Sequence, residues 1–356
     1  MLNGRNELEM KMVDLRSDTL TLPTREMLES ILDAPLGDDA RDRDPTVERL
    51  EEMAARKVGK EEAVLVTSGT QANLVSLLSQ TSPGDEVIVE SEAHINYYEA
   101  GGLSSVAGLM PRPVVGKLGA LSPDQVERTI LTGTPRRSRI QLICIENTHN
   151  RAGGTCISPS QIADLKEVAD KHGLSIYMDG ARIFNAAIAL RVDVRELTKN
   201  VDSMMFCLSK GLSGPVGSIV LGTHEFIKKA REWRSVLGGT LRQAGIIAAP
   251  GIVALEKMID RLREDHENAR RLAEGLVDIR GIVVDMRTVQ TNIVKLDVSG
   301  LGCDCNRFMT ELEKHGVRAS GLGGSMVRMV TYRGIEASDI NTALERIRAT
   351  AESLRA

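Results

Sequence analysis

Three short segments, far apart in the chain, carry residue types that could together hold an anion and react with a carbonyl group. Ser68-Gly69-Thr70 follows an apolar run and precedes a helical segment, so backbone amides and two hydroxyls there could bind a phosphate. Asp179 ends a second apolar run, where its carboxylate could keep a heterocyclic nitrogen protonated. Lys210 follows a third run, and burial near an apolar core favours the neutral amine that Schiff-base chemistry needs.

Each of these signals also has an ordinary structural interpretation. Turns between strands and helices use Ser, Gly and Thr for conformational reasons, an Asp can close a turn, and a Lys can extend from a loop into solvent. The order of the three signals is more specific than any one of them. Asp179 lies about 110 residues after the phosphate turn and Lys210 lies 31 residues after Asp179, each at the end of a predicted strand.

The segments around these residues alternate between short apolar runs and helical periodicity. Such runs are typical of strands buried on both faces of a sheet, and they occupy Val64–Val66, Val87–Val89, Leu142–Ile145, Ile176–Met178, Met204–Phe206 and Ile219–Leu221. Helical spacing covers Gln71–Gln80 and Gln161–His172, and a helix from Pro45 to Gly59 has Asp44 as its cap. Strands that alternate with helices predict an α/β domain with a mostly parallel sheet.

The pattern changes after about residue 250. We predict a loose tail over residues 1–11, a large domain over 12–250 and a smaller α+β domain over 251–356. Helical spacing from Ile252 to Leu276 predicts one long helix at the start of the smaller domain. Further strands and helices are predicted at Ile282–Val284, Ile293–Leu296, Asn306–His315, Val327–Val330 and from Ala337 onward.

The composition favours a small-molecule partner. Lys and Arg total 45 against 49 Asp and Glu, so the net charge of −4 provides no basic field for a nucleic acid or an acidic membrane. Arg261 and Arg263 form only a short basic cluster, which is typical of a solvated helix face. Five cysteines without a C-x-x-C spacing, and no apolar run of signal-peptide or membrane-helix length, favour a cytoplasmic protein. Six histidines without metal-ligand spacing predict that no metal is bound.

The ordered phosphate turn, aspartate and lysine resemble the cofactor site of fold type I pyridoxal 5'-phosphate (PLP) enzymes, which share the aspartate aminotransferase fold. From about residue 12 to the last helix, further strings resemble the L-threonine aldolase family: Asp14–Thr19, Gly37–Asp39, Asp44–Thr46, Glu146–Asn150, Asp179–Asn185 and Gly238–Gln243. The resemblance implies a PLP-dependent aldehyde-lyase that cleaves L-threonine or L-allo-threonine to glycine and an aldehyde.

The resemblance also implies which residues hold the cofactor. Lys210 would form the Schiff base, Asp179 would pair with the pyridine nitrogen, and Ser68-Gly69-Thr70 would hold the phosphate. His94 would stack on the ring and assist proton transfer, and Glu99 could order a catalytic water near it.

Other matching positions are implied to bind the substrate or to serve a second subunit. Ser17 and Arg328 would bind the α-carboxylate, and Arg182 would reach the same carboxylate or the ring's phenolic oxygen. Residues 14–18 must then fold back to the site of Lys210. The resemblance also implies a homodimer or homotetramer with active sites at the subunit interfaces. Arg242 would then contribute to cofactor binding in a neighbouring subunit's site.

Two positions depart from the family pattern near the substrate. Arg41 lies in Ala40–Arg43, where the family usually has a tyrosine followed by glycine, and Arg136 stands where many members have a histidine. Both arginines could simply face solvent. Alternatively, one of them accepts an anionic β-substituent, so that the substrate is not threonine.

Other reactions remain open at this point. A β-eliminating lyase or an amino-acid racemase would use the same cofactor and break a different bond. A non-catalytic PLP-binding protein would keep the fold alone, and the joint presence of Lys210, Asp179, His94 and Arg328 argues against it.

Overall fold

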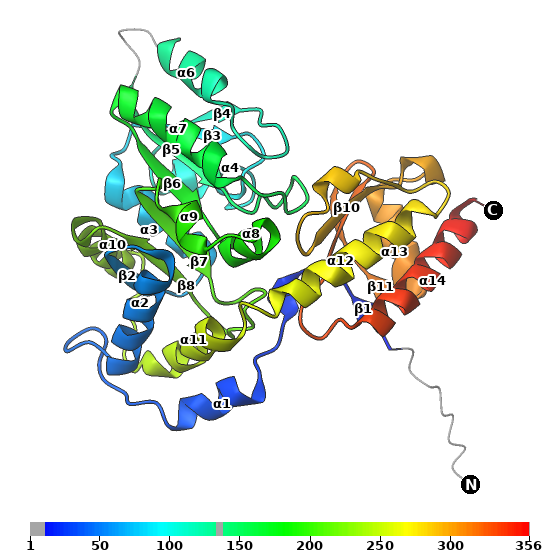
Figure 1. Ribbon diagram of the computed structural model, residues 1–356, viewed down its shortest axis with the longest axis horizontal. Helices are drawn as coiled ribbons and strands as arrows, with labels where there is room; N and C mark the ends of the chain where they lie inside the picture. Colours follow the sequence, from blue (N-terminus) through cyan, green and yellow to red (C-terminus); the bar gives the residue numbers. More distant parts are fainter. Residues whose placement is uncertain (1–10, 133–137, 356) are drawn as a thin grey trace.

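The computed structural model describes residues 11–132 and 138–355, which form two domains side by side (Figure 1). The predicted tail over residues 1–11 lies outside the described residues except for Lys11. None of the described helices combines the length and the apolar character needed to span a bilayer.

A seven-stranded sheet forms the centre of the larger domain. Its strands follow the order β2 (Glu62–Val66), β8 (Ser218–Gly222), β7 (Ser203–Cys207), β6 (Ser175–Asp179), β5 (Ile140–Glu146), β3 (Glu86–Glu90) and β4 (Met110–Val114). All neighbours from β7 to β4 pair in parallel, whereas β8 is antiparallel to both β7 and β2. The carboxyl ends of six strands therefore meet at one edge of the sheet, where ligands of open α/β sheets bind.

All six predicted strands of this domain are present. Alternate residues of each strand enter two separate apolar clusters, one on each face of the sheet, which explains the continuous apolar runs. The sequence Met-Pro-Arg-Pro-Val of β4 was not predicted to be a strand. It lies at the sheet edge, where proline is tolerated because one side of the strand needs no hydrogen-bond partner.

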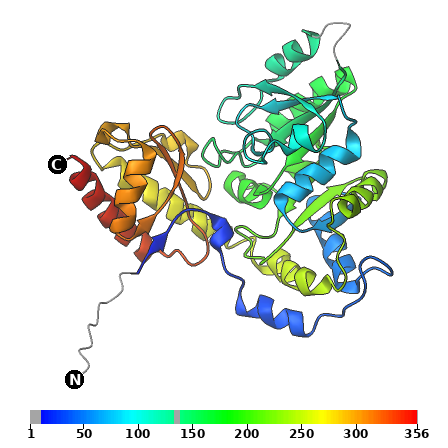
Figure 2. The ribbon, with the colours of Figure 1, turned by 180° about the vertical axis from the view of Figure 1, so that it is seen from behind.

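Helices cover both faces of this sheet (Figures 1 and 2). One cluster packs α2 (Pro45–Val58), α6 (Pro123–Leu131), α7 (Pro159–His172), α8 (Ile183–Leu190), α9 (Val194–Thr198) and α11 (Gly245–Lys257). The other packs α3 (Gly69–Gln80), α4 (His94–Tyr97), α5 (Gly102–Ser105) and α10 (His224–Val236). The predicted cap of α2 is confirmed, because the Asp44 carboxylate accepts hydrogen bonds from the amides of Thr46 and Val47.

The smaller domain has a core of its own. A four-stranded antiparallel sheet of β12 (Ser320–Gly323), β13 (Met326–Val330), β10 (Ile293–Asp297) and β9 (Val283–Val284) packs against α12 (Leu262–Val277), α13 (Cys305–Lys314) and α14 (Ala337–Arg355). The chain start joins this domain, since β1 (Val13–Asp14) pairs in parallel with β11 (Val317–Arg318). Helix α1 (Arg25–Leu32) then leads back across to α11.

The prediction of one helix from Ile252 to Leu276 is wrong. The chain turns between Lys257 and Leu262, which ends α11 and starts α12. Helix α11 packs into the first core beyond residue 250, and α12 packs mainly into the second. Periodicity alone missed the break because no glycine or proline marks it.

Candidate active site

Five residues that the sequence predicted for the site line one cavity of about 400 Å³ between the two domains: Ser17, His94, Arg182, Lys210 and Arg328. Lys210 lies in the loop after β7, and Arg182 is the residue just before α8. His94 begins α4, whereas Ser17 and Arg328 come from the chain start and β13. The cavity thus combines strand ends of the large domain with one face of the small domain's sheet.

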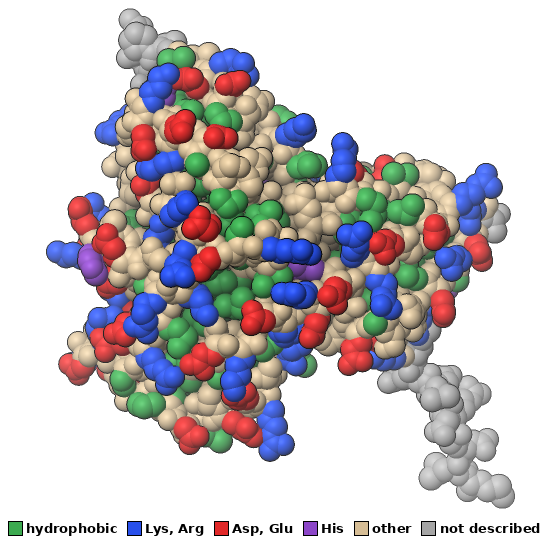
Figure 3. Space-filling view, viewed as in Figure 1, with side chains coloured by type: hydrophobic (Ala, Val, Ile, Leu, Met, Phe, Trp, Pro, Cys, Tyr) green, Lys and Arg blue, Asp and Glu red, His purple; other side chains and the backbone are tan. Residues whose placement is uncertain are grey.

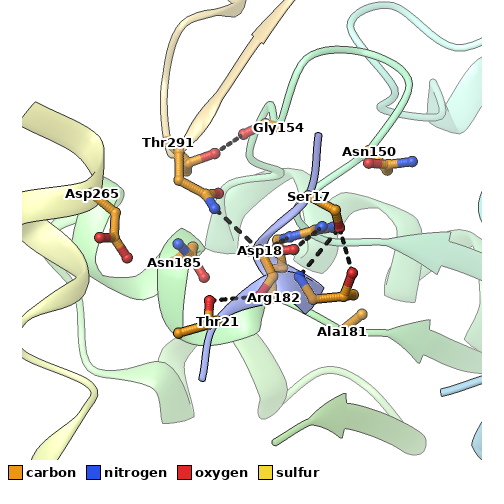
Figure 4. Close-up of polar contacts among 12 residues, drawn as sticks. Ser17, Asp18, Thr21, Asn150, Gly154, Ala181, Arg182, Asn185, Asp265 and Thr291 are labelled. Atoms are coloured by element: carbon orange, nitrogen blue, oxygen red, sulfur yellow. Dashed lines mark hydrogen bonds and ion pairs between the residues drawn. The ribbon is translucent and has the colours of Figure 1, made fainter. Parts of the chain in front are cut away.

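The chain start does fold back to the site of Lys210, as the sequence predicted. Ser17 caps a short 3-10 helix (Asp18–Leu20) and accepts hydrogen bonds from the amide and hydroxyl of Thr19. The next residue, Asp18, is fully buried and pairs with Arg182 through two hydrogen bonds of 2.6 and 2.7 Å (Figure 4). Burial opposes the charge, but the contact with Arg182 lowers the pKa of Asp18 to about 2.

Two nitrogens of Arg182 therefore donate hydrogen bonds to Asp18, and the same side chain lines the cavity. The Asn292 amide also donates to Asp18 from the small domain, at 3.2 Å. A guanidinium fixed in this way is pre-organised, because its orientation no longer depends on the substrate. The same three residues connect the chain start to both domains.

Asp179 is buried at the end of β6 and holds a defined set of partners. One of its carboxylate oxygens accepts the Ala181 amide at 3.0 Å, and the other accepts the Asn73 side-chain amide at 3.0 Å. The Asn73 nitrogen also donates to Glu99 at 2.6 Å, and the Tyr177 hydroxyl donates to the Asn73 oxygen. A single amide thus joins two buried carboxylates.

His94 completes this network at the cavity wall. Its Nδ1 lies 2.9 Å from the Glu99 carboxylate, which confirms that Glu99 lies next to His94. Burial lowers the pKa of His94, but the hydrogen bond to Glu99 and the charges of Asp179 and Glu146 outweigh this and raise it. For Glu99, in contrast, burial is the main cause of a raised pKa. His94, Glu99 and Asp179 lie close enough to suggest a metal site, and the absence of a bound metal stays a prediction.

The predicted phosphate turn lies at the start of α3. Ser68 caps the helix by accepting the Gln71 amide, which leaves the amides of Gly69 and Thr70 free of helical partners. Gly69 packs tightly on the end of β7, because a side-chain carbon there would lie 3.0 Å from the Cys207 sulfur. The turn and Lys210 therefore share the same sheet edge.

Arg328 is held at the opposite wall of the cavity. Its terminal nitrogens donate to Asn150 at 2.7 Å and to the Arg16 carbonyl at 3.1 Å, while its buried Nε has no partner among the described residues. Burial, together with repulsion from Arg182, lowers the pKa of Arg328. Arg328 lines the cavity and forms no ion pair with a carboxylate of the described residues, so its guanidinium is suited to bind a carboxylate there.

Two of the arginines singled out from the sequence, Arg41 and Arg242, are not among the residues that line this cavity. Arg242 is exposed and its closest charged partner is Asp38 at 3.5 Å, although nearby Gly239 packs on the Gln71 side chain at the start of α3. Arg41 is 79% exposed at its side chain and lies 3.7 Å from Asp38. Arg136 lies outside the described residues.

Several residues of the site were not predicted from the sequence. Asp18 and Asn150 stand in strings that carried the resemblance, so a buried partner for Arg182 or Arg328 could have been sought there. Asn73 has a local signal as well, since it is a polar residue on the buried face of α3, one turn after the phosphate turn. Tyr98 lines the cavity without any such signal.

Known proteins share both the sequence and the fold. A family model described as beta-eliminating lyase matches residues 14–299. Low-specificity L-threonine aldolase 1 of Arabidopsis thaliana is 40% identical over 340 residues, which cover 94% of this chain and 95% of that protein. This chain belongs to the threonine aldolase family of beta-eliminating lyases.

Two solved structures relate the family assignment to the fold. A threonine aldolase of Leishmania major matches with a TM-score of 0.79 at 16% identity and covers 96% of this chain and 99% of that chain. The aspartate aminotransferase of Rhizobium meliloti matches with a TM-score of 0.71 at 19% identity, over 96% and 92% of the two chains. The predicted family and the predicted fold class are both confirmed.

Proposed function

We propose that this protein is a PLP-dependent aldehyde-lyase that cleaves L-threonine or L-allo-threonine to glycine and an aldehyde. One observation carries the proposal. A single cavity is lined by Ser17, His94, Arg182, Lys210 and Arg328. It lies at the sheet edge where the predicted phosphate turn and Asp179 are also located. Family membership supports the same reaction.

The residues present fit the cofactor. The free amides of Gly69 and Thr70 suit a phosphate, and Asp179 is a buried carboxylate that suits a protonated pyridine nitrogen. Lys210 would hold the cofactor through its amine, and His94 would lie against the ring. When bound, PLP supplies a sink for the electrons of the broken bond between Cα and Cβ.

Three residues would bind and orient the substrate. Arg328 is held by Asn150 and the Arg16 carbonyl, and Arg182 is fixed by Asp18, so both are oriented before the α-carboxylate binds. Ser17 would add a hydroxyl contact. By fixing the carboxylate in this way, these residues would control which bond at Cα is presented for cleavage.

His94 and Glu99 would handle the proton of the β-hydroxyl. Glu99 holds the Nδ1 side of the imidazole, which leaves Nε2 for the substrate. Burial lowers the pKa of His94, but Glu99 and the charges of Asp179 and Glu146 raise it overall, which makes the imidazole a stronger base for that proton.

Product analysis tests the proposal. Purified protein with bound cofactor should convert L-threonine to equal amounts of glycine and acetaldehyde, and Lys210→Ala should abolish the reaction. Ammonia and a keto acid as the main products would refute it in favour of β-elimination. Preference for β-hydroxyaspartate over threonine would instead support an anionic substrate and a role for Arg41 or Arg136.

We also infer a homo-oligomer in which Arg242 serves the site of a neighbouring copy. In support, Arg242 is exposed and is not among the residues that line the cavity of its own chain. Lys210→Ala and Arg242→Ala should each be inactive alone, and mixing them should restore about one quarter of the activity in a dimer. No recovery after subunit exchange would refute the shared site. Five free thiols support a cytoplasmic location.

A further inference from the structure

A second cavity lies between the domains and carries a distinct set of charges. Its volume is about 680 Å³, and its lining combines the end of α8, one face of α12 and residues 289–291. Arg191 comes from the large domain, whereas Arg263, His266 and Arg270 lie three to four residues apart on α12. One wall therefore belongs to each domain.

The charges of this cleft are mostly positive. Three arginines line it against one carboxylate, Glu267. Arg270 pairs with Glu274 at 2.9 Å, but the ion pairs found in the described part of the chain include neither Arg191 nor Arg263. Burial lowers the pKa of His266 to about 4, so this histidine is a neutral hydrogen-bonding group at physiological pH. On the face shown in Figure 3, basic side chains border a histidine where the domains meet.

Two residues that line this cleft, His266 and Thr291, connect it to residues near the active-site cavity. His266 Nε2 lies 3.1 Å from the side-chain nitrogen Nδ2 of Asn185. The backbone amide of Asn185 donates to the carbonyl of Arg182. Thr291 donates to the Gly154 carbonyl at 2.7 Å and is followed by Asn292, which holds Asp18 (Figure 4). The lining of the cleft is thus two contacts away from the Asp18–Arg182 pair.

We propose that this cleft binds a small polyanion carrying at least two phosphate or carboxylate groups, and that the bound ligand changes substrate binding at the active site. Guanidinium groups from both walls can each hold one anionic group, which would link the two domains. The sequence suggested only a solvated face at Arg263, because the opposite wall comes from a segment more than 70 residues earlier. The binding site goes beyond the aldol reaction and does not depend on it, whereas the effect on substrate binding rests on the proposed function.

Calorimetric titration of the PLP-loaded protein tests the binding, with inorganic pyrophosphate and citrate as separate probes at constant ionic strength. Saturable binding of one molecule per chain is expected, and the better probe identifies the anionic group. Arg263→Ala should weaken binding at least about tenfold, whereas Glu267→Gln should strengthen it because it removes the one repelling carboxylate. Arg271→Ala is the matched control, since it removes an exposed arginine of the same helix outside the cleft lining.

The outcomes separate the two parts of the proposal. No saturable binding of either probe, or equal weakening by Arg263→Ala and Arg271→Ala, would overturn the site. Binding that leaves the KM for threonine unchanged would overturn the link to the active site, and a change in KM that Arg263→Ala removes would support it. If the protein does not cleave threonine, the titration still tests the site.

Discussion

Replacement of Asn73 by alanine tests the buried network that connects Asp179 to His94. The Asn73 side chain is 1% exposed, donates to Glu99 and Asp179, and accepts from Tyr177. Alanine would leave three buried polar groups short of a partner, each of which costs about 1–3 kcal/mol, and relaxation would recover part of that sum. We expect a loss of about 3–5 kcal/mol, which lowers the melting temperature on the order of 10 °C.

The same substitution should change the pH dependence of catalysis. The hydrogen bond from Asn73 lowers the pKa of Glu99, so its removal lets Glu99 bind a proton more readily. A neutral Glu99 supports the imidazolium less, and the pKa of His94 should fall. The acid limb of the kcat/KM profile for threonine should therefore move to lower pH.

Calorimetric melting of the PLP-loaded protein and kinetics across pH provide the two measurements. Tyr177→Phe is the graded control, because it removes only the hydroxyl that donates to Asn73 and should cost about 1–2 kcal/mol. A melting temperature of Asn73→Ala equal to that of the wild type would refute the energetic argument. A destabilised variant with an unchanged pH profile would show that Asn73 only supports the fold.

The remaining predictions concern three other residues. Glu99→Gln should move the acid limb of kcat/KM to lower pH, because the main partner that raises the pKa of His94 is lost; an unmoved limb would exclude His94 as its source. Asp18→Asn should cost about 3–5 kcal/mol and raise the KM, since it leaves the buried Arg182 charge without its partner. The wild-type stability that Asp18 contributes is present above pH 3.8 and is lost as the pH falls through about 2, so acid melting curves of the two proteins should converge there and parallel curves would contradict the pairing. Arg328→Lys should raise the KM for threonine about tenfold or more with a smaller change in kcat, and an unchanged KM would remove Arg328 from carboxylate binding.

The sequence alone was enough to predict the cofactor edge of the site. Lys210, Asp179 and the turn at Ser68 each follow an apolar run of strand length, and parallel strands bring their carboxyl ends to one edge of a sheet. Local hydrophobic patterning therefore determines their proximity without any knowledge of distant contacts. Family strings then predicted Ser17, Arg182 and Arg328, which the tertiary structure places in the same cavity.

Only the tertiary structure decided which charges pair and where the domains divide. Asp18 and Arg182 are 164 residues apart, and Asn73 and Asp179 are 106 residues apart. No local pattern specifies which buried carboxylate meets which donor, because exposed acidic and polar residues occur in similar local sequence patterns. The turn between α11 and α12 also carried no glycine or proline signal. Packing into two separate cores determines this turn, and it places α12 along the second cavity.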